Sequence, residues 1–390
     1  MQPLLSPPPV SAAELLQRLA NMRREMATDD LDWLVLTDRK NIGYFCDYLT
    51  LTWAYHSRPL LCLVGQDDFV LIASRIETRN LAQAPRAFEV CFYDGYELEA
   101  VAACREAIRT HRPTGSARIA VDHGQDMFGR GSIALADMIG ELARDAFAIN
   151  GVAAIWRVRM IKSAYEVGLK RQSFEIVNAA FDDAIASARI GMSERELCSD
   201  VQARILHNGA DQADAIAMTF GRGDFIYNRP PSDRPLQPED YVWTDFRSPY
   251  GGYPADRNRI ARAGRPAVWE EASYETVRTL TLEVARSIRP GVLCRDVFEV
   301  YKRFWAEAKL PQPYGLISRI GHGGGLDVTE PPSLSATDLT VISPGMVLHL
   351  EPKLELEGAV FQFEEIVHVL EEGVEFVSAL SPRALPVVEC

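Results

Sequence analysis

The chain has 390 residues, of which 47% are hydrophobic and 24% charged, and it is long enough to form two domains that each bury a core. Its formal net charge of −13 excludes nucleic acid and an anionic membrane as expected partners, because both would require a basic patch. The seven cysteines form no CxxC pair, the Pro-rich start lacks a basic segment, and no apolar run is long enough to span a membrane. We therefore expect a cytoplasmic protein with reduced cysteines.

The first part of the chain, residues 11–154, is predicted to be an α/β domain. Ser11 followed by Glu14 is a helix-capping pattern, and apolar residues then recur at helical spacing. Short apolar segments predict four strands, at 31–38, 41–45, 59–64 and 69–74. Helices are predicted at 100–111 and 132–145, with a strand between them at 118–122. Strands that alternate with helices are typical of an α/β domain.

The second part, residues 155–384, is predicted to place helices outside a curved antiparallel sheet. A long helix follows the join near Trp156. Ser193 with Glu196 is another capping pattern and predicts a helix that Gly209 ends. Two further helices are expected at 267–288 and 295–308, and strands are expected over the last 70 residues.

The segment YVWTDFRSPYGGYPADRNR, residues 241–259, reads as a β-hairpin with a carboxylate on each arm, Asp245 and Asp256. Tyr250, Gly251 and Gly252 supply the turn. Two buried carboxylates at such a short distance repel each other, and one keeps its proton unless a cation lies between them. Two solvated loop aspartates are the alternative.

Three segments nearer the C-terminus add further polar groups. The segment GHGGGLDVTEPP, residues 321–332, places His322 among glycines, which allow the backbone and the imidazole ring to approach a small ligand closely. MVLHLEP is a strand that ends at Glu351, and VFQFEEIVHV is a strand whose alternation places Glu364 and Glu365 on opposite faces. Four carboxylates and one imidazole form an oxygen-rich set that suits a pair of divalent ions such as Mn, Fe(II), Co or Zn.

The order and spacing of these residues resemble the pita-bread metallopeptidase family, which includes methionine aminopeptidase, aminopeptidase P, prolidase and the non-peptidase creatinase. The resemblance rests on two aspartates eleven residues apart, GHGxGLD at 321–327, EP at 351 and FEE at 363. It covers residues 155–384 and implies the metal ligands Asp245, Asp256, His322, Glu351 and Glu364. It also implies a creatinase-type first domain, a homodimer, and Glu351 as the group that takes a proton from a water between the ions.

The chain departs from this family at two positions that bear on the substrate. Peptidases of the family have a histidine seventeen residues before the first aspartate, which here is Asn228, and another seven after the ligand histidine, which here is Thr329. An amide and a hydroxyl form hydrogen bonds but do not titrate near neutral pH. The family glycine after EP is Lys353, and the arginine two residues before the last glutamate is Gln362.

Other residues are candidates for substrate contacts. His349 lies two residues before Glu351 on one strand face and is either an acid–base group or a strand histidine bonded to a carboxylate. Tyr227 donates a proton only if its pKa is lowered. His56 and Arg58 lie in a loop of the first domain, and in creatinase-type dimers that region reaches the partner's site, so Arg58 is either a substrate-carboxylate ligand or a solvated arginine.

The sequence thus predicts a two-domain metal-dependent hydrolase with two divalent ions (Mn, Co, Zn or Fe), acting on an amide-like C–N bond in a small substrate. By family, the substrate is an Xaa-Pro dipeptide or peptide. The replacements at Asn228 and Thr329 favour the first alternative, a small-molecule hydrolase of the creatinase or ectoine hydrolase type. A non-catalytic binding protein is the second alternative, although unpaired buried carboxylates would be costly to keep without a metal.

Overall fold

The computed structural model describes residues 6–55, 57–83, 87–111, 117–124, 127–128, 132–144, 148–312 and 318–389. The chain forms two compact units. The N-terminal unit is Pro9–Arg159, and the C-terminal unit is Met160–Cys390 together with the start of the chain up to Pro8. Among the described residues, no helix is both long enough and apolar enough to cross a membrane.

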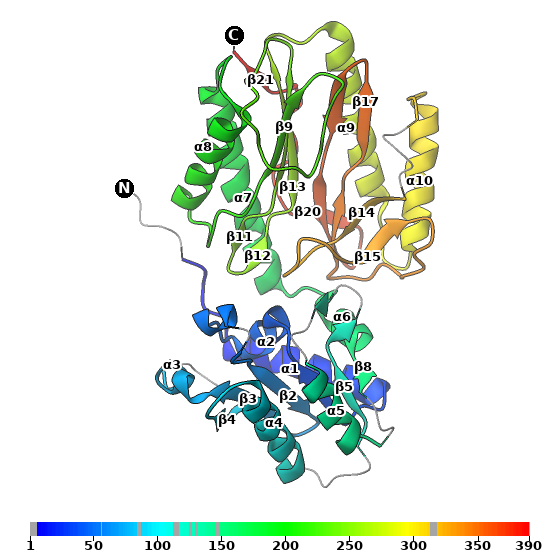
Figure 1. The fold of residues 1–390 in the computed structure, drawn as a ribbon. Helices are drawn as coiled ribbons and strands as arrows, with labels where there is room; N and C mark the ends of the chain where they lie inside the picture. Colours follow the sequence, from blue (N-terminus) through cyan, green and yellow to red (C-terminus); the bar gives the residue numbers. More distant parts are fainter. Residues whose placement is uncertain are drawn as a thin grey trace. The chain divides into compact units, whose positions relative to one another are not determined.

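The N-terminal unit is built on a six-stranded sheet with the strand order β4-β3-β2-β1-β5-β8 (Figure 1). Its strands β1, β2, β3, β4, β5 and β8 are Trp33–Leu36, Leu61–Gly65, Phe69–Ser74, Glu89–Tyr93, Ile119–Val121 and Ile149–Asn150, and the small ribbon β6 and β7 is His123–Gly124 and Met127–Phe128. Its helices α1 to α6 are Ala12–Thr28, Arg39–Cys46, Thr78–Leu81, Glu97–His111, Ile133–Leu142 and Val152–Arg159. The buried faces of α4 and α5 share one apolar core with the sheet. The predicted α/β domain is confirmed.

One predicted helix start and one predicted strand have different outcomes in this unit. The Ser11 side chain accepts a hydrogen bond from the Glu14 backbone N–H at the start of α1, as predicted. Residues 41–45 were expected to be a strand, and that prediction is wrong because they lie in helix α2. Asp38 caps this helix by accepting from the backbone of Lys40 and Asn41, which stabilises the helical start.

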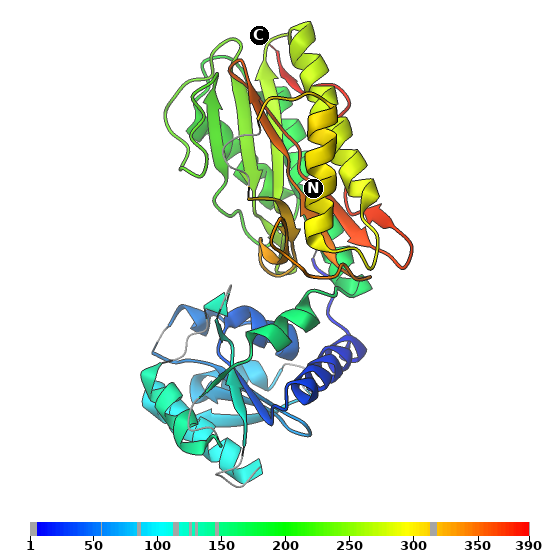
Figure 2. The same ribbon diagram turned by 90° about the vertical axis from the view of Figure 1, so that its right-hand side faces the viewer.

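The C-terminal unit contains two sheets, antiparallel apart from one parallel edge strand in the first, and a set of helices outside them (Figure 2). The first sheet has the order β21-β13-β10-β9, with bounds Val387–Val388, Arg257–Ala263, Tyr241–Phe246 and Ala217–Gly221. The second has the order β15-β14-β16-β19-β20, with bounds Glu330–Ser335, Arg319–Gly323, Val347–Leu350, Glu365–Val369 and Val374–Phe376. Each sheet also has a two-stranded ribbon between two of its strands: β11–β12 (Pro249–Tyr250 and Tyr253–Pro254) between β10 and β13, and β17–β18 (Lys353–Leu356 and Ala359–Gln362) between β16 and β19.

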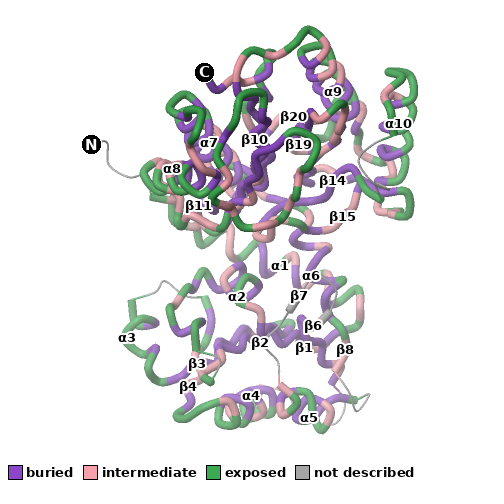
Figure 3. The backbone as a smooth tube through the Cα atoms, turned by 45° about the horizontal axis from the view of Figure 1, so that its top comes forward, coloured by how far each residue is buried: buried purple, intermediate pink, exposed green. Residues whose placement is uncertain are grey.

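Two helix pairs cover these strands. The four helices α7, α8, α9 and α10 are Ala164–Ser187, Glu194–His207, Val268–Ser287 and Cys294–Glu307. The α7–α8 pair packs into the core that contains β9, β10 and β13, and the α9–α10 pair packs into a second core with β14, β16 and β18. Figure 3 shows the result, with β10, β14 and β19 buried and long stretches of α8 and α10 exposed. This is the predicted layout of helices outside a sheet.

Most of the predicted local elements of this unit are confirmed. Ser193 and Glu196 form a complete capping box at the start of α8. The segment VFQFEEIVHV is not one strand, because the ladder breaks at residues 363–364 between β18 and β19. Glu364 then contacts His349, whereas Glu365 pairs with Arg257, so the neighbouring glutamates point to different partners as the alternation predicted.

Candidate metal centre

The two aspartates of the hairpin come together as their spacing predicted. Strands β10 and β13 pair in antiparallel register with Asp245 opposite Asn258, and Asp256 immediately precedes β13. Gly251 and Gly252 turn the chain with φ angles of 60° and 80°, which side chains other than glycine rarely adopt. Burial and the nearby Asp256 carboxylate raise the pKa of Asp245 to about 7. The pair is therefore poised to accept a cation.

His322 and two further carboxylates, Glu351 and Glu364, lie close to Asp256. His322 Nε2 lies 3.3 Å from Asp256 Oδ2 and 3.5 Å from Glu351 Oε1. Ligand atoms of Asp256, His322 and Glu364 all lie within 4.8 Å of one another, and all three residues are buried. Burial, and then Asp256 and Glu351, raise the pKa of Glu364. Burial acts to lower the pKa of His322, but Asp256 and Glu351 outweigh it and the pKa rises.

The glycines around His322 allow strands β14 and β16 to approach closely. A Cβ atom on Gly321 would lie 1.9 Å from the His349 carbonyl oxygen, and one on Gly324 would lie 2.4 Å from His349 Nε2. A side chain at position 321 would displace the backbone of the neighbouring strand, and one at position 324 would displace the His349 ring. The GHGGG segment is thus needed for packing as well as for the position of the His322 ring.

His349 supports the cluster from behind. Its ring is fully buried and stacks on His322 with 5.1 Å between centroids, and its Nδ1 is hydrogen-bonded to Glu364 Oε1 at 2.7 Å. Burial, and then Lys170, lower its pKa, and Nε2 has no hydrogen-bond partner among the described residues. The contact with Glu364 matches the alternative of a strand histidine bonded to a carboxylate.

These groups fit a divalent ion. Burial, and then repulsion from the other carboxylates, raises the pKa of Asp245 and Glu364, and a cation between them would relieve that cost. Carboxylate oxygens with one imidazole are ligands that Mn, Fe(II), Co and Zn accept, and the bond from His349 to Glu364 is a typical support behind such a ligand.

Two buried lysines near the site were not predicted. Lys162 Nζ pairs with Glu330 at 2.9 Å, and both side chains are only 1% exposed. Lys170 Nζ donates to the Pro254 carbonyl at 2.7 Å, and burial lowers the pKa of this lysine to about 8. The sequence position of Lys170 could have indicated its burial, because it lies four residues before Phe174 and therefore on the apolar face of α7.

Arg247 is another functional candidate that the sequence reasoning missed. Its Nη2 lies 3.2 Å from Asp245 Oδ2 and 3.5 Å from the side-chain oxygen of Asn228. Asn228 is exposed and has a φ of 58°, so its backbone is left-handed. The spacing of two residues from Asp245 was a usable signal, because alternate residues of an extended segment share a face.

Lys353 and Tyr227 form a second polar group beside the carboxylates. Lys353 Nζ lies 3.6 Å from the centre of the Tyr227 ring and 5.6 Å from that of Trp243. The Tyr227 hydroxyl donates to Glu355 at 2.6 Å. Burial lowers the pKa of Lys353 to about 8 despite the attraction of nearby carboxylates. The Tyr227 hydroxyl therefore donates its proton to Glu355, which is not one of the predicted metal ligands.

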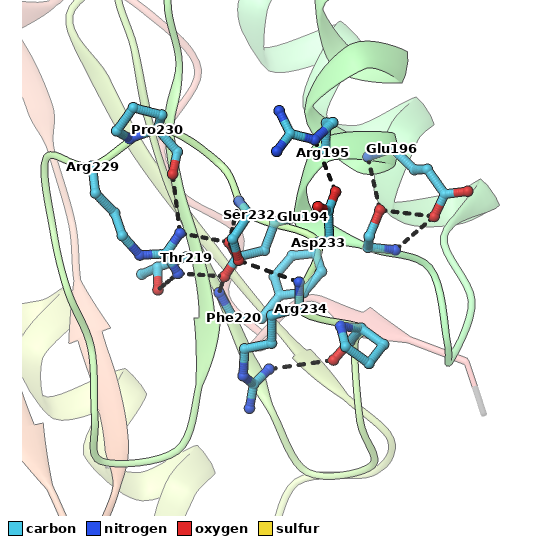
Figure 4. Close-up of polar contacts among 12 residues, drawn as sticks. Glu194, Arg195, Glu196, Thr219, Phe220, Arg229, Pro230, Ser232, Asp233 and Arg234 are labelled. Atoms are coloured by element: carbon cyan, nitrogen blue, oxygen red, sulfur yellow. Dashed lines mark hydrogen bonds and ion pairs between the residues drawn. The ribbon is translucent and has the colours of Figure 1, made fainter.

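The loop that carries Asn228 is fixed by the buried carboxylate of Glu194 (Figure 4). The Arg229 guanidinium donates to both Glu194 oxygens at 2.6 and 2.7 Å, and Ser232 donates through its backbone and its hydroxyl at 2.8 and 2.6 Å. The Phe220 backbone N–H of β9 adds a further bond at 2.8 Å. These bonds tie the chain that follows Asn228 to the start of helix α8.

The remaining predicted residues lie in different settings. Thr329 is exposed and follows the glycine-rich segment, next to the buried Glu330. Arg58 belongs to the N-terminal unit, where its guanidinium carbon lies 5.4 Å from the centre of the Tyr96 ring. His56 lies outside the described residues. The five predicted metal-binding side chains all belong to the C-terminal unit.

Comparison with protein-family models gives two matches. The model described as metallopeptidase family M24 matches residues 169–371, and that of the creatinase/prolidase N-terminal domain matches residues 18–161. Among curated proteins, the chain is 24% identical to an uncharacterized peptidase from Staphylococcus saprophyticus over 372 residues, covering 92% of this chain and 98% of that one. It is 21% identical to one from Bacillus subtilis, covering 95% and 99%.

Solved structures share the fold over nearly the whole chain. The dipeptidase PepE from Mycobacterium ulcerans superposes with a TM-score of 0.80 at 23% identity, covering 98% of this chain and 100% of that one. The Xaa-Pro dipeptidase from Bacillus anthracis gives a TM-score of 0.81 at 20% identity, with coverage of 96% and 99%. At these identities the likeness establishes a shared two-domain architecture.

Proposed function

Because the chain belongs to the metallopeptidase family M24, a family of hydrolases, we propose that it hydrolyses an amide-like C–N bond in a small polar substrate with the aid of two divalent ions. Xaa-Pro dipeptides are the first substrates to test, since solved structures with this fold include an Xaa-Pro dipeptidase. The observation that carries the proposal is the buried cluster of Asp256, His322 and Glu364, with Glu351 3.5 Å from His322.

The two ions would be held by the side chains of Asp245, Asp256, His322, Glu351 and Glu364. Ions held there would polarise the substrate carbonyl and lower the pKa of a water. Glu351 would accept the proton of that water. Of the two carboxylates near His322 Nε2, Glu351 is the more exposed, at 28% against 8% for Asp256. His349 would hold Glu364 in place through the bond to its Nδ1.

The substrate would be bound by polar groups at the exposed side of the site. Asn228 and Thr329 are both exposed and would form hydrogen bonds with it. We further propose a cytoplasmic homodimer, in which Arg58 of one subunit would bind a substrate carboxylate in the other as a bidentate fork. Manganese is the metal to test first, because the donor set is mainly carboxylate.

A second candidate function is the hydrolysis of a small non-peptide substrate. It is favoured by Asn228 and Thr329, since neither side chain titrates near neutral pH in the way an imidazole does. Each positioned acid–base group typically contributes about 10² or more in rate, so a peptidase without both would be slow. A binding protein without catalysis is the third candidate, and an intact set of ligands counts against it.

The test compares metal content and turnover in the wild type and in Asp256→Ala. The wild type is expected to retain divalent metal, and Asp256→Ala is expected to lose it. Glu371→Ala is the control, because it removes an exposed carboxylate of the same unit and should retain the metal. Turnover of an Xaa-Pro dipeptide with Mn(II) would support the peptidase. Metal without dipeptide turnover would favour the small-molecule hydrolase, and no metal under any loading condition would overturn the dinuclear mechanism.

A further inference from the structure

We infer that the site selects an anionic substrate and that Arg247 binds the negative group. The substrate class is an N-acylated amino acid, in which the amide C–N bond lies next to a carboxylate and the acyl side carries no ammonium group. The inference rests on the hydrolase proposed above and adds the charge that its substrate must carry. It does not require Arg58 or a second subunit, since Arg247 and the predicted metal ligands belong to one unit.

Arg247 lies between the predicted metal ligands and the exposed side of the site. Its Nη2 lies 3.2 Å from Asp245 Oδ2 and 3.5 Å from the side-chain oxygen of Asn228. Asn228 is exposed, and the Arg247 side chain is 42% exposed against 19% for that of Asp245. A substrate group that lies on the exposed side of Asp245 therefore comes within reach of this guanidinium.

The Arg247 guanidinium suits a carboxylate ligand. Both contacts above use Nη2, and Nε is buried and has no hydrogen-bond partner among the described residues. A ligand therefore has to bind through the two terminal amino groups, whose parallel N–H donors match the two oxygens of a carboxylate. The charge of this side chain is permanent, because an arginine does not lose its proton in a folded protein.

Lys353 places a second cation beside the same loop. It follows Glu351 by two residues, and its Nζ lies 3.6 Å from the centre of the Tyr227 ring. Tyr227 directly precedes Asn228, the residue that Arg247 contacts. An ammonium group and a guanidinium group thus both lie next to the segment that we expect to bind the substrate.

The charge of the loaded site favours an anion. The two divalent ions proposed above would cancel the charges of the four predicted carboxylate ligands. Arg247 and Lys353 then leave an excess of positive charge at the exposed side of the site. This charge attracts a carboxylate on the substrate and repels an ammonium group.

Carboxylates close to the site that could bind an ammonium group already have partners. Glu355 accepts the Tyr227 hydroxyl at 2.6 Å, and Glu330 pairs with Lys162 at 2.9 Å. The free N-terminus of a dipeptide would have to displace one of these partners, whereas an uncharged acyl group would not. Hydrolysis would add one water across the C–N bond and release the acyl group as a carboxylate and the nitrogen as the protonated amine of the amino acid.

The experiment compares four compounds that differ in the charge at each end: N-acetylproline, N-acetylproline amide, alanylproline and alanylproline amide. Calorimetric titration of the Mn(II)-loaded full-length protein would give their dissociation constants for the wild type, Arg247→Gln, Arg247→Lys and Arg222→Gln. Arg222 is the matched control, because it pairs with Glu239 at 3.1 Å in the same unit. Where a compound is hydrolysed, its KM and kcat would be measured as well.

The wild type is expected to bind N-acetylproline at least about tenfold more tightly than its amide and than alanylproline. Arg247→Gln should weaken the binding of N-acetylproline by about tenfold and change that of the amide by less than about threefold. Arg247→Lys should retain most of the preference because it keeps the charge, and Arg222→Gln should match the wild type. If N-acetylproline is hydrolysed, Arg247→Gln should raise its KM and leave kcat within about threefold.

Equal affinities of the wild type for N-acetylproline and its amide, or the same loss for both in Arg247→Gln, would overturn the inference. Tighter binding of alanylproline than of N-acetylproline would also overturn it, since the site would then accept an ammonium group. If the charge preference is present but no compound is hydrolysed, the anion site stands and the proposed hydrolase fails. If a compound is hydrolysed without any charge preference, the hydrolase stands and the inference fails. Arg247→Met replaces Arg247→Gln should the latter fail to fold.

Discussion

Replacement of Glu194 by glutamine is expected to destabilise the C-terminal unit and to release the loop that carries Asn228. The Glu194 side chain is fully buried. Burial alone would raise its pKa, but the Arg229 fork and the bonds from Phe220 and Ser232 lower the pKa from 4.5 to about 2. A shift of this size corresponds to about 3 kcal/mol of stability, and an amide cannot accept the Arg229 fork as an anion does.

The sign of the pH dependence follows from the lowered pKa. A carboxylate with a folded pKa below its unfolded pKa stabilises the protein fully above the unfolded value of about 4.5, and this stability is lost as the pH falls towards 2. About three-fifths of it is lost by pH 3, because the unfolded carboxylate is then mostly protonated while the folded one is still mostly ionised. The difference in unfolding free energy between wild type and Glu194→Gln should therefore shrink between pH 5 and about pH 3.

The assay is chemical unfolding of both proteins at several pH values, monitored for the transition of the C-terminal unit. Glu239→Gln serves as the control, since Glu239 is an exposed partner of Arg222 and such surface pairs contribute little. A difference below about 1 kcal/mol at pH 7, or one that does not change with pH, would refute the reasoning.

Three further predictions concern the groups around the cluster of Asp256, His322 and Glu364. Lys170→Met should raise the unfolding free energy of metal-free protein at pH 7 by about 2 kcal/mol, because burial has lowered the pKa of this lysine to about 8. The gain should vanish above about pH 10.5, where the lysine is neutral in both the folded and the unfolded state. Equal unfolding curves of the two proteins at pH 7 would contradict this prediction. Gly324→Ala should cost about 1–3 kcal/mol in unfolding free energy, since its Cβ would meet His349 Nε2 at 2.4 Å, and unchanged stability would show that the ring moves freely. His349→Gln should weaken Mn(II) binding by about tenfold or more in a chelator competition, because Glu364 loses its support; an unchanged affinity would assign His349 to packing alone.

Local patterns in the sequence predicted most of the elements correctly. The Ser193–Glu196 capping box, the Asp245–Asp256 hairpin and the strand before Glu351 depend on neighbouring residues, and the structure contains all three. The segment 41–45 was misread because a short apolar run fits a strand and a buried helix equally well. Its helical form is set by capping at Asp38 and by a bond between Asn41 and Asp122, which lies 81 residues away.

Local patterns were enough to predict the candidate ligands and their order, because a carboxylate hairpin, a glycine-flanked histidine and two glutamates next to strands are features of neighbouring residues. The buried lysines and the second imidazole around these candidates depend instead on how distant segments pack. Lys162 on Glu330, Lys170 on the Pro254 carbonyl and His349 on Glu364 are contacts in a buried, low-dielectric region between residues that are 168, 84 and 15 positions apart in the chain. The interaction energy of such groups depends on the distance between them, and for residues far apart in the chain that distance is fixed by the packing of strands and helices.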